Sequence, residues 1–387
     1  MKYYEEVRMN KAKLGHRKIQ QVGRGSYIIS LPKEWVKEAR MEKGSELELR
    51  LREDSSLVLL PSKRSEESGS ASPTLKEYLM HIEKKDDPQS ICRKIVALYV
   101  VNSDLIHIYS KDAYVLTIFK KFISNLVKNT LLGSEIIDET PNEIIIKTLI
   151  KSDQFPVEQA IRRMAILALS AIKDIVVVLK NMDENLIQSI IDVRNDVTRL
   201  NLYVVRQLKF GLEQDIYKDL GFKTPKEFLG YRIVANDIKS IADSAMNIAN
   251  KMITLKKLIQ DQTLFLKETI DEEAHSQIEK FNLQASNLLE DSLTALFKRD
   301  YNHADKVIIN VESLATRESD LAALIFSKKF DPNISSIFSL ILDSSRHIIE
   351  YSKNIAEVTL NRTIEEVIEQ NHISKIWLKK GELSSTY

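Results

Sequence analysis

Residues 240–250 read SIADSAMNIAN, and residues 347–357 read HIIEYSKNIAE. The two stretches align on the shared triplet Asn-Ile-Ala with an offset of 107 residues. The offset is 117 residues where Asp183 aligns with Asp300, so the second stretch belongs to a copy that is shorter in its middle. Self-similarity of this kind is typical of a duplicated structural unit. We therefore expect two copies of one fold in the C-terminal part of the chain.

Long amphipathic helices are predicted throughout both copies. Apolar residues recur with a period of about 3.6 residues, as on a helix that buries one face. Helix-start signals stand at Thr224-Pro225 and Asp331-Pro332. The predicted helices cover residues 156–181, 183–214 and 224–260 in the first copy and 262–299, 301–329 and 332–372 in the second. Because three such helices can enclose a core, we expect two tandem three-helix bundles over 153–260 and 262–372.

The N-terminal segment has a different pattern, which predicts a short β-rich unit within residues 1–64. Residues 17–61 read RKIQQVGRGSYIISLPKEWVKEARMEKGSELELRLREDSSLVLLP. The glycines of this stretch mark a tight turn before a β-rich run, a short helix over 33–40 follows, and strict apolar/polar alternation from Glu46 opens a hairpin. A unit of this size cannot cover both faces of its strands alone. We expect it to pair with a second copy.

A linker and a small α+β module separate the two parts. Residues 65–74 read SEESGSASPT, with Ser, Gly and Pro but no apolar anchor, which is typical of a linker. The module over 75–150 is expected to contain a helix at 90–101, a strand at 104–109, a helix at 111–129 and a hairpin within 135–149. Its pattern does not indicate a function.

Charge is distributed unevenly along the chain. Residues 1–64 carry 15 Lys and Arg against 9 Asp and Glu, whereas the whole chain has a net charge of only +1. A basic head on a mildly acidic remainder indicates that the head meets a polyanion, although a basic surface without a partner would look the same. The single cysteine excludes an internal disulfide and fits a reducing cytosol. With no long apolar window and no signal-peptide pattern, we expect a cytoplasmic protein without a membrane span.

Two family resemblances follow from these motifs. The stretch G-x-S-Y-I-I-S-L-P-K-E-W, followed by K-G-S-E-L-E-L, resembles the swapped-hairpin DNA-binding domain of the AbrB, MazE and SpoVT group. The duplicated region, with VTRLNLYVVRQL at 197–208 and IADSAMNIAN at 241–250, resembles the PhoU fold of phosphate-uptake regulators. The combination resembles an archaeal type of phosphate-uptake regulator. The implied fold is multidomain and mostly α: a dimeric swapped-hairpin β-barrel, the α+β module and two tandem three-helix bundles.

The head resemblance implies a set of DNA-contacting residues. Its members are basic or polar and lie on the first strand, in the glycine turn or at the start of the short helix: Arg17, Lys18, Gln20, Gln21, Arg24, Ser26 and Lys33. Such side chains can reach phosphates, and an arginine can also bind the edge of a guanine. The alternative is a head that has lost DNA binding and serves only to dimerise.

The body departs from the PhoU pattern at its metal motif. Members of that family carry two acids four residues apart on helices two and three, and some bind iron or zinc clusters there. Here Lys239 precedes Asp243 and Arg346 precedes Glu350, so we expect ion pairs in place of a metal and no cofactor. If iron or zinc binds, the candidate ligands are Asp192, Asp196 and Asp243.

Two functions are compatible with this sequence. The first is a DNA-binding transcriptional regulator of phosphate uptake and phosphate homeostasis, whose head binds DNA as a dimer and whose body relays phosphate status. The second is a protein–protein regulator whose body docks on the ATPase of a phosphate transporter or on a sensor kinase. The sequence contains no motif that combines a nucleophile, a general base and a general acid. We therefore expect no enzyme activity.

Overall fold

The structure is a computed structural model that describes residues 16–23, 25–51, 56–61, 75–150, 154–214, 216–218, 220–260, 272–328 and 330–383. Contacts divide the chain into two compact units, residues 1–74 and residues 75–387. Each unit is described by itself.

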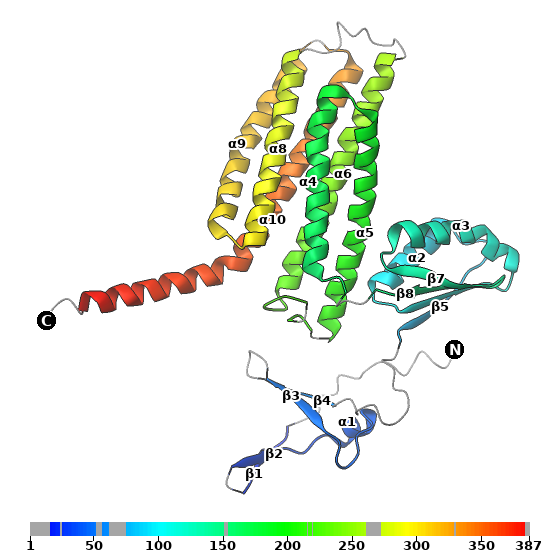
Figure 1. Cartoon of the computed structure of the whole chain (residues 1–387), viewed down its shortest axis with the longest axis vertical. Helices are drawn as coiled ribbons and strands as arrows, with labels where there is room; N and C mark the ends of the chain where they lie inside the picture. The colour runs from blue at the N-terminus through cyan, green and yellow to red at the C-terminus, as the bar shows by residue number, and fades with distance from the viewer. Residues whose placement is uncertain are drawn as a thin grey trace. The chain divides into compact units, whose positions relative to one another are not determined.

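The first unit contains two hairpins joined by a short helix (Figure 1). Strand β1 (Gln20–Val22) pairs antiparallel with β2 (Ser26–Ile28), and β3 (Leu47–Leu51) pairs antiparallel with β4 (Leu57–Pro61). Helix α1 (Lys33–Glu38) lies between the hairpins in the sequence. Each hairpin is a separate two-stranded sheet, so the described residues of one chain form no closed barrel. The expected barrel, which would take strands from a second copy, therefore stays a prediction.

The α+β module opens the second unit and has one strand more than the sequence predicted. Its order is β5 (Glu77–His81), α2 (Pro88–Val100), β6 (Leu105–Tyr109), α3 (Ala113–Thr130), β7 (Ser134–Glu139) and β8 (Glu143–Thr148). The strands form one sheet in the order β5-β6-β8-β7, with β5 parallel to β6 and the other pairs antiparallel. The prediction missed β5 because its five residues include Glu, Leu and Met, which are good helix formers.

Helices α2 and α3 cover one face of this sheet (Figure 1). Alternate strand residues such as Ile106, Ile108, Ile144 and Ile146 are buried against them. The module is joined to the helical body by buried contacts. Arg206 of the body donates from Nη1 to the backbone oxygen of Tyr99 at 2.7 Å and lies over the Tyr99 ring.

Six long helices make up the body. They are α4 (Val157–Asn181), α5 (Glu184–Gln214), α6 (Glu227–Gln260), α8 (Glu272–Lys298), α9 (Tyr301–Ser327) and α10 (Pro332–Leu383). These bounds agree closely with the predicted helices, except that α10 is longer and the first ten residues of the predicted helix at 262–299 lie outside the described residues. Figure 1 shows α4, α5 and α6 as one bundle beside α8, α9 and α10.

The two bundles share one hydrophobic core. Buried residues of all six helices, from Val157 on α4 to Ala356 on α10, belong to a single continuous cluster. Helix α4 packs against α8, and α6 packs against α10, across the boundary between the repeats. The expectation that each triplet closes its own core was therefore wrong. Apolar residues on α4 and α6 lie on more than one face and are buried toward the other repeat as well.

Candidate functional site

The first hairpin carries most of the residues expected to contact DNA. Gly23, in the turn between β1 and β2, has φ of +67°, a conformation that glycine adopts without strain. The register pairs Gln20 with Ile28 and Gln21 with Tyr27. Ser26, paired with Val22, therefore lies on the face that carries Gln20, while Gln21 lies on the opposite face. The three members of the predicted set on its strands are thus divided between the two faces of the hairpin.

The basic residues of the set are solvent-accessible where they are described. Arg17 and Lys18 precede β1, Lys33 is the first residue of α1, and all three are exposed. Arg24 lies outside the described residues. Exposed cations beside an exposed two-stranded ribbon can bind phosphates without rearrangement of a core.

The second hairpin leaves an apolar face uncovered. Leu49 pairs with Leu59 and Leu51 pairs with Leu57 across β3 and β4. Leu49 is 62% exposed and Leu51 is 75% exposed, and none of the described residues of the first unit is buried. An exposed apolar face of this kind is typical of an interaction surface.

The three candidate metal ligands do not converge. Asp192 and Asp196 on α5 line a cavity of about 400 Å³ together with Arg194 and Arg199. Asp243 on α6 accepts hydrogen bonds from Lys239 Nζ at 2.6 Å and from Arg194 Nε at 2.7 Å. Burial opposes ionisation of Asp243, but these two cations outweigh it and hold the pKa of the carboxyl below its ordinary value. Both of its oxygens are therefore committed to side-chain cations.

The ion pairs predicted from the sequence are present in both repeats. Lys239 pairs with Asp243, and Arg346 pairs with Glu350, Asp343 and Glu318. Within the residues that the structure describes, no group of three or more His, Cys, Asp or Glu side chains is arranged to hold a metal ion. The absence of iron and zinc from the body stays a prediction. Sequence reasoning missed Arg194, whose contact with Asp243 joins α5 to α6.

A second ion-pair network, also missed, lies where α6, α10 and the turn between α8 and α9 meet. The Glu227 side chain is 8% exposed and accepts from Arg362 Nε at 2.5 Å and from Arg299 Nη1 at 3.5 Å. Arg299 also pairs with Glu366, which Lys223 contacts in turn. The network lines a cavity of about 370 Å³ between the two repeats. No sequence signal marks it, because its members come from segments far apart in the chain.

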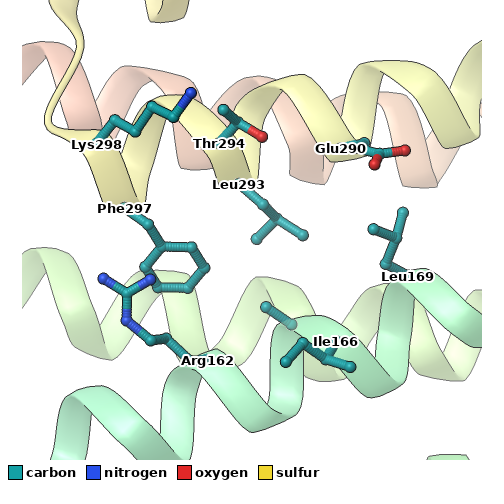
Figure 2. A pocket seen from close by; sticks show the side chains of 9 residues that line it. Arg162, Ile166, Leu169, Glu290, Leu293, Thr294, Phe297 and Lys298 are labelled. Carbon is teal, nitrogen blue, oxygen red and sulfur yellow. The ribbon is translucent and has the colours of Figure 1, made fainter.

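An apolar groove lies between α4 and α8, on the surface of the body (Figure 2). Its cavity of about 340 Å³ is lined by Ile166 and Leu169 from α4 and by Leu293 and Phe297 from α8. Ile166 is 61% exposed. The Arg162 guanidinium lies 4.2 Å from the centre of the Phe297 ring, at one end of the groove.

The geometry defines a β-hairpin head with exposed cations, joined to a duplicated helical body. Two family models match the chain in the same places. Residues 20–67 match the antidote-toxin recognition family MazE, a bacterial antitoxin, and residues 161–252 match the PhoU domain. The chain thus has a segment similar to MazE followed by one similar to the PhoU domain, in the order that the sequence resemblance predicted, and the PhoU match lies within the first repeat of the body.

Two solved structures of PhoU proteins are similar to the chain. The chain is similar to the phosphate transport system regulatory protein PhoU from Streptococcus pneumoniae, with 15% identity, a TM-score of 0.43, and coverage of 53% of this chain and 91% of that one. It is similar to PhoU from Pseudomonas aeruginosa, with 15% identity, a TM-score of 0.42, and coverage of 55% and 98%. No curated protein matches the chain. Among the described helices, none has an apolar stretch long enough to span a bilayer.

Proposed function

We propose that this chain is a DNA-binding regulator of phosphate uptake. The head binds DNA as a homodimer, and the PhoU-like body relays phosphate status to it. The observation that carries the proposal is the first hairpin, where Arg17 and Lys18 are exposed beside β1 in a segment of MazE type. The net charge of +6 over residues 1–64, from 15 basic and 9 acidic residues, supports contact with a polyanion.

The uncovered leucines of the second hairpin support the dimer. With Leu49 and Leu51 more than half exposed, a single head has too little buried surface to be stable. A second head that covers this face removes the exposed apolar area. Pairing also doubles the cations presented to DNA, which strengthens binding to a two-fold site.

The α4/α8 groove favours a second candidate function, a protein–protein regulator. Its apolar walls, together with Arg162 at one end, suit a helix of a partner such as a transporter ATPase or a signalling protein. In this alternative the head serves only to dimerise. We expect no enzyme activity under either function and a cytoplasmic location under both.

DNA binding by the full chain is expected to weaken steeply with salt. Each phosphate neutralised in a duplex contributes about −0.9 to the slope of log K against log salt. Lys18→Ala removes two cations from a dimer, so the slope should become less negative by up to about 2. Fluorescence anisotropy on a duplex from the region upstream of the chain's own gene measures the slope.

Lys209→Ala is the matched control, because Lys209 is exposed on α5 in the other unit. This variant should keep the slope of the unmodified chain. If the unmodified chain binds no duplex at low salt, or if Lys18→Ala has the same slope as Lys209→Ala, the head does not bind DNA through this hairpin. The protein–protein function is then preferred.

We further propose that the body binds no structural iron or zinc. Asp243 is already neutralised by Lys239 and Arg194, and a bound cation would be repelled by both. The full chain, purified after growth with added iron and zinc, should contain well under one metal ion per chain by elemental analysis. Several ions per chain would contradict the displacement of metal by these ion pairs.

A further inference from the structure

Strand β5 has a free hydrogen-bonding side. The backbone oxygen of Lys76 accepts from β6, and the backbone N–H of Ile82 donates to β6. Backbone groups alternate in direction along a strand, so the groups of Glu77, Leu79 and His81 point away from β6. Among the described strands, none pairs with that side of β5.

The other edge of the sheet is protected, whereas this one is not. Strand β7 has a register irregularity between Ile136 and Asp138, and it carries acidic residues along its exposed side. Bulges and charges are the devices that prevent edge strands from pairing with other chains. Strand β5 pairs in regular register with β6, and its central residue Leu79 is 72% exposed. The contrast between the bulged, acidic β7 edge and the regular β5 edge indicates that β5 pairs with another strand.

We propose that β5 pairs antiparallel with β5 of a second copy, about a two-fold axis through Leu79. In this register Glu77 lies opposite His81 of the second copy, and Tyr78 lies opposite Met80. The outward backbone groups of both strands then meet as hydrogen-bonded pairs. The His81 imidazole carries at least one N–H whether it is neutral or charged, so it can donate to the Glu77 carboxylate of the second copy. One such pair at each end of the two-stranded contact adds stabilisation. When two copies of EYLMH run antiparallel in this register, the acidic first residue of each faces the histidine of the other, and apolar side chains face each other between them.

The second copy is the occupant because the chain itself brings it close. Strand β5 begins at Glu77, directly after the first unit ends at Thr74. If the heads dimerise as in the proposed function, on which the inference rests for this tether, two β5 strands are held at high effective concentration. A five-residue pairing that is weak between free molecules is then populated. It joins the two sheets into one and relates the two bodies by a two-fold axis.

Cysteine cross-linking of the full chain tests this pairing. Cys92 is the only cysteine, so Leu79→Cys in a Cys92→Ser background places a single thiol at the proposed axis. Directly opposed residues of hydrogen-bonded antiparallel pairs have Cα atoms about 5.5 Å apart, within the range that a disulfide spans. Mild oxidation with copper phenanthroline should give mainly covalent dimer. Ile137→Cys in the same background is the control, because Ile137 is 49% exposed on the opposite edge and should cross-link several-fold less.

A charge exchange tests the register. Adding Glu77→Lys to the Leu79→Cys variant places a cation opposite His81 and should reduce the yield of covalent dimer. Adding His81→Glu as well should restore it, which random collision or misfolding would not do. Light scattering of the unoxidised protein reports separately on the head dimer. A dimeric mass with equal cross-linking at residues 79 and 137 overturns the β5 pairing alone, and a monomeric mass overturns the head dimer.

Discussion

Replacing Asp237 by asparagine is expected to raise the free energy of unfolding by about 3 kcal/mol above about pH 6. Asp237 lies on α6, is 4% exposed, and its Oδ2 has no hydrogen-bond partner among the described residues. Burial raises the pKa of this carboxyl to about 6, and a hydrogen bond from Asn354 on α10 opposes the shift only in part. The ionised form is therefore unfavourable in the folded chain.

The pH dependence follows from the direction of this shift. The pKa in the folded chain is higher than the value of about 3.9 in the unfolded chain, so the folded state holds its proton more tightly. The destabilisation caused by the ionised Asp237 carboxylate is absent below about pH 4 and complete above about pH 6. The increase in the free energy of unfolding that Asp237→Asn gives should have the same pH dependence. Urea unfolding at several pH values measures it. Asp305→Asn, on the exposed side of α9, is the control, and a gain that does not vary with pH would contradict this origin.

Replacing Glu227 by alanine should destabilise the body by about 3–5 kcal/mol. The change leaves Arg362, whose side chain is only 12% exposed, without its carboxylate partner at 2.5 Å. An unpaired buried charge loses hydration without compensation. Urea unfolding of the full chain, followed by the helical circular dichroism signal that comes mostly from the second unit, should show the loss as a lower urea concentration at the midpoint.

Two variants separate this effect from loss of any surface ion pair. Glu158→Ala removes the partner of Arg162, but both side chains are more than 40% exposed, so a loss below about 1 kcal/mol is expected. In Glu227→Met with Arg362→Met no buried charge remains unpaired, and part of the lost stability should return. If Glu227→Ala costs no more than Glu158→Ala, the buried network does not hold the repeats together.

The long helices and most strands of the α+β module could be predicted from the sequence, whereas strand β5 could not. A period of 3.6 residues repeated over many turns is a strong signal, so the predicted ends of α4 and α5 agree with the structure to within one residue. Strand β5 was missed because Glu, Leu and Met, which are good helix formers, take three of its five positions, whereas β6, of the same length, carries two isoleucines and a tyrosine. The shared core of the two repeats was missed because periodicity shows which residues are buried and not which helix buries them.

The candidate sites divide in the same way. The Lys239–Asp243 pair could be predicted because residues four apart on a helix are always neighbours. Arg194 and Asp243 are 49 residues apart in the chain, and Glu227 and Arg362 are 135 apart, so their contacts depend on how helices pack. The position of Ser26 on the same face as Gln20 depends on the register of the first hairpin, which only the structure gives.

The continuous core of the body also restricts how this chain can change shape. Two bundles with separate cores could hinge about the connection between them, as independent domains do. Here α4 and α8, and α6 and α10, are buried against each other, so a hinge there would expose apolar surface. The two repeats thus form one packing unit with a shared interior. Ligand or partner binding at any of its helices is therefore expected to move the body as a whole. A truncation that removes one repeat would expose the apolar surface that the other repeat buries against it.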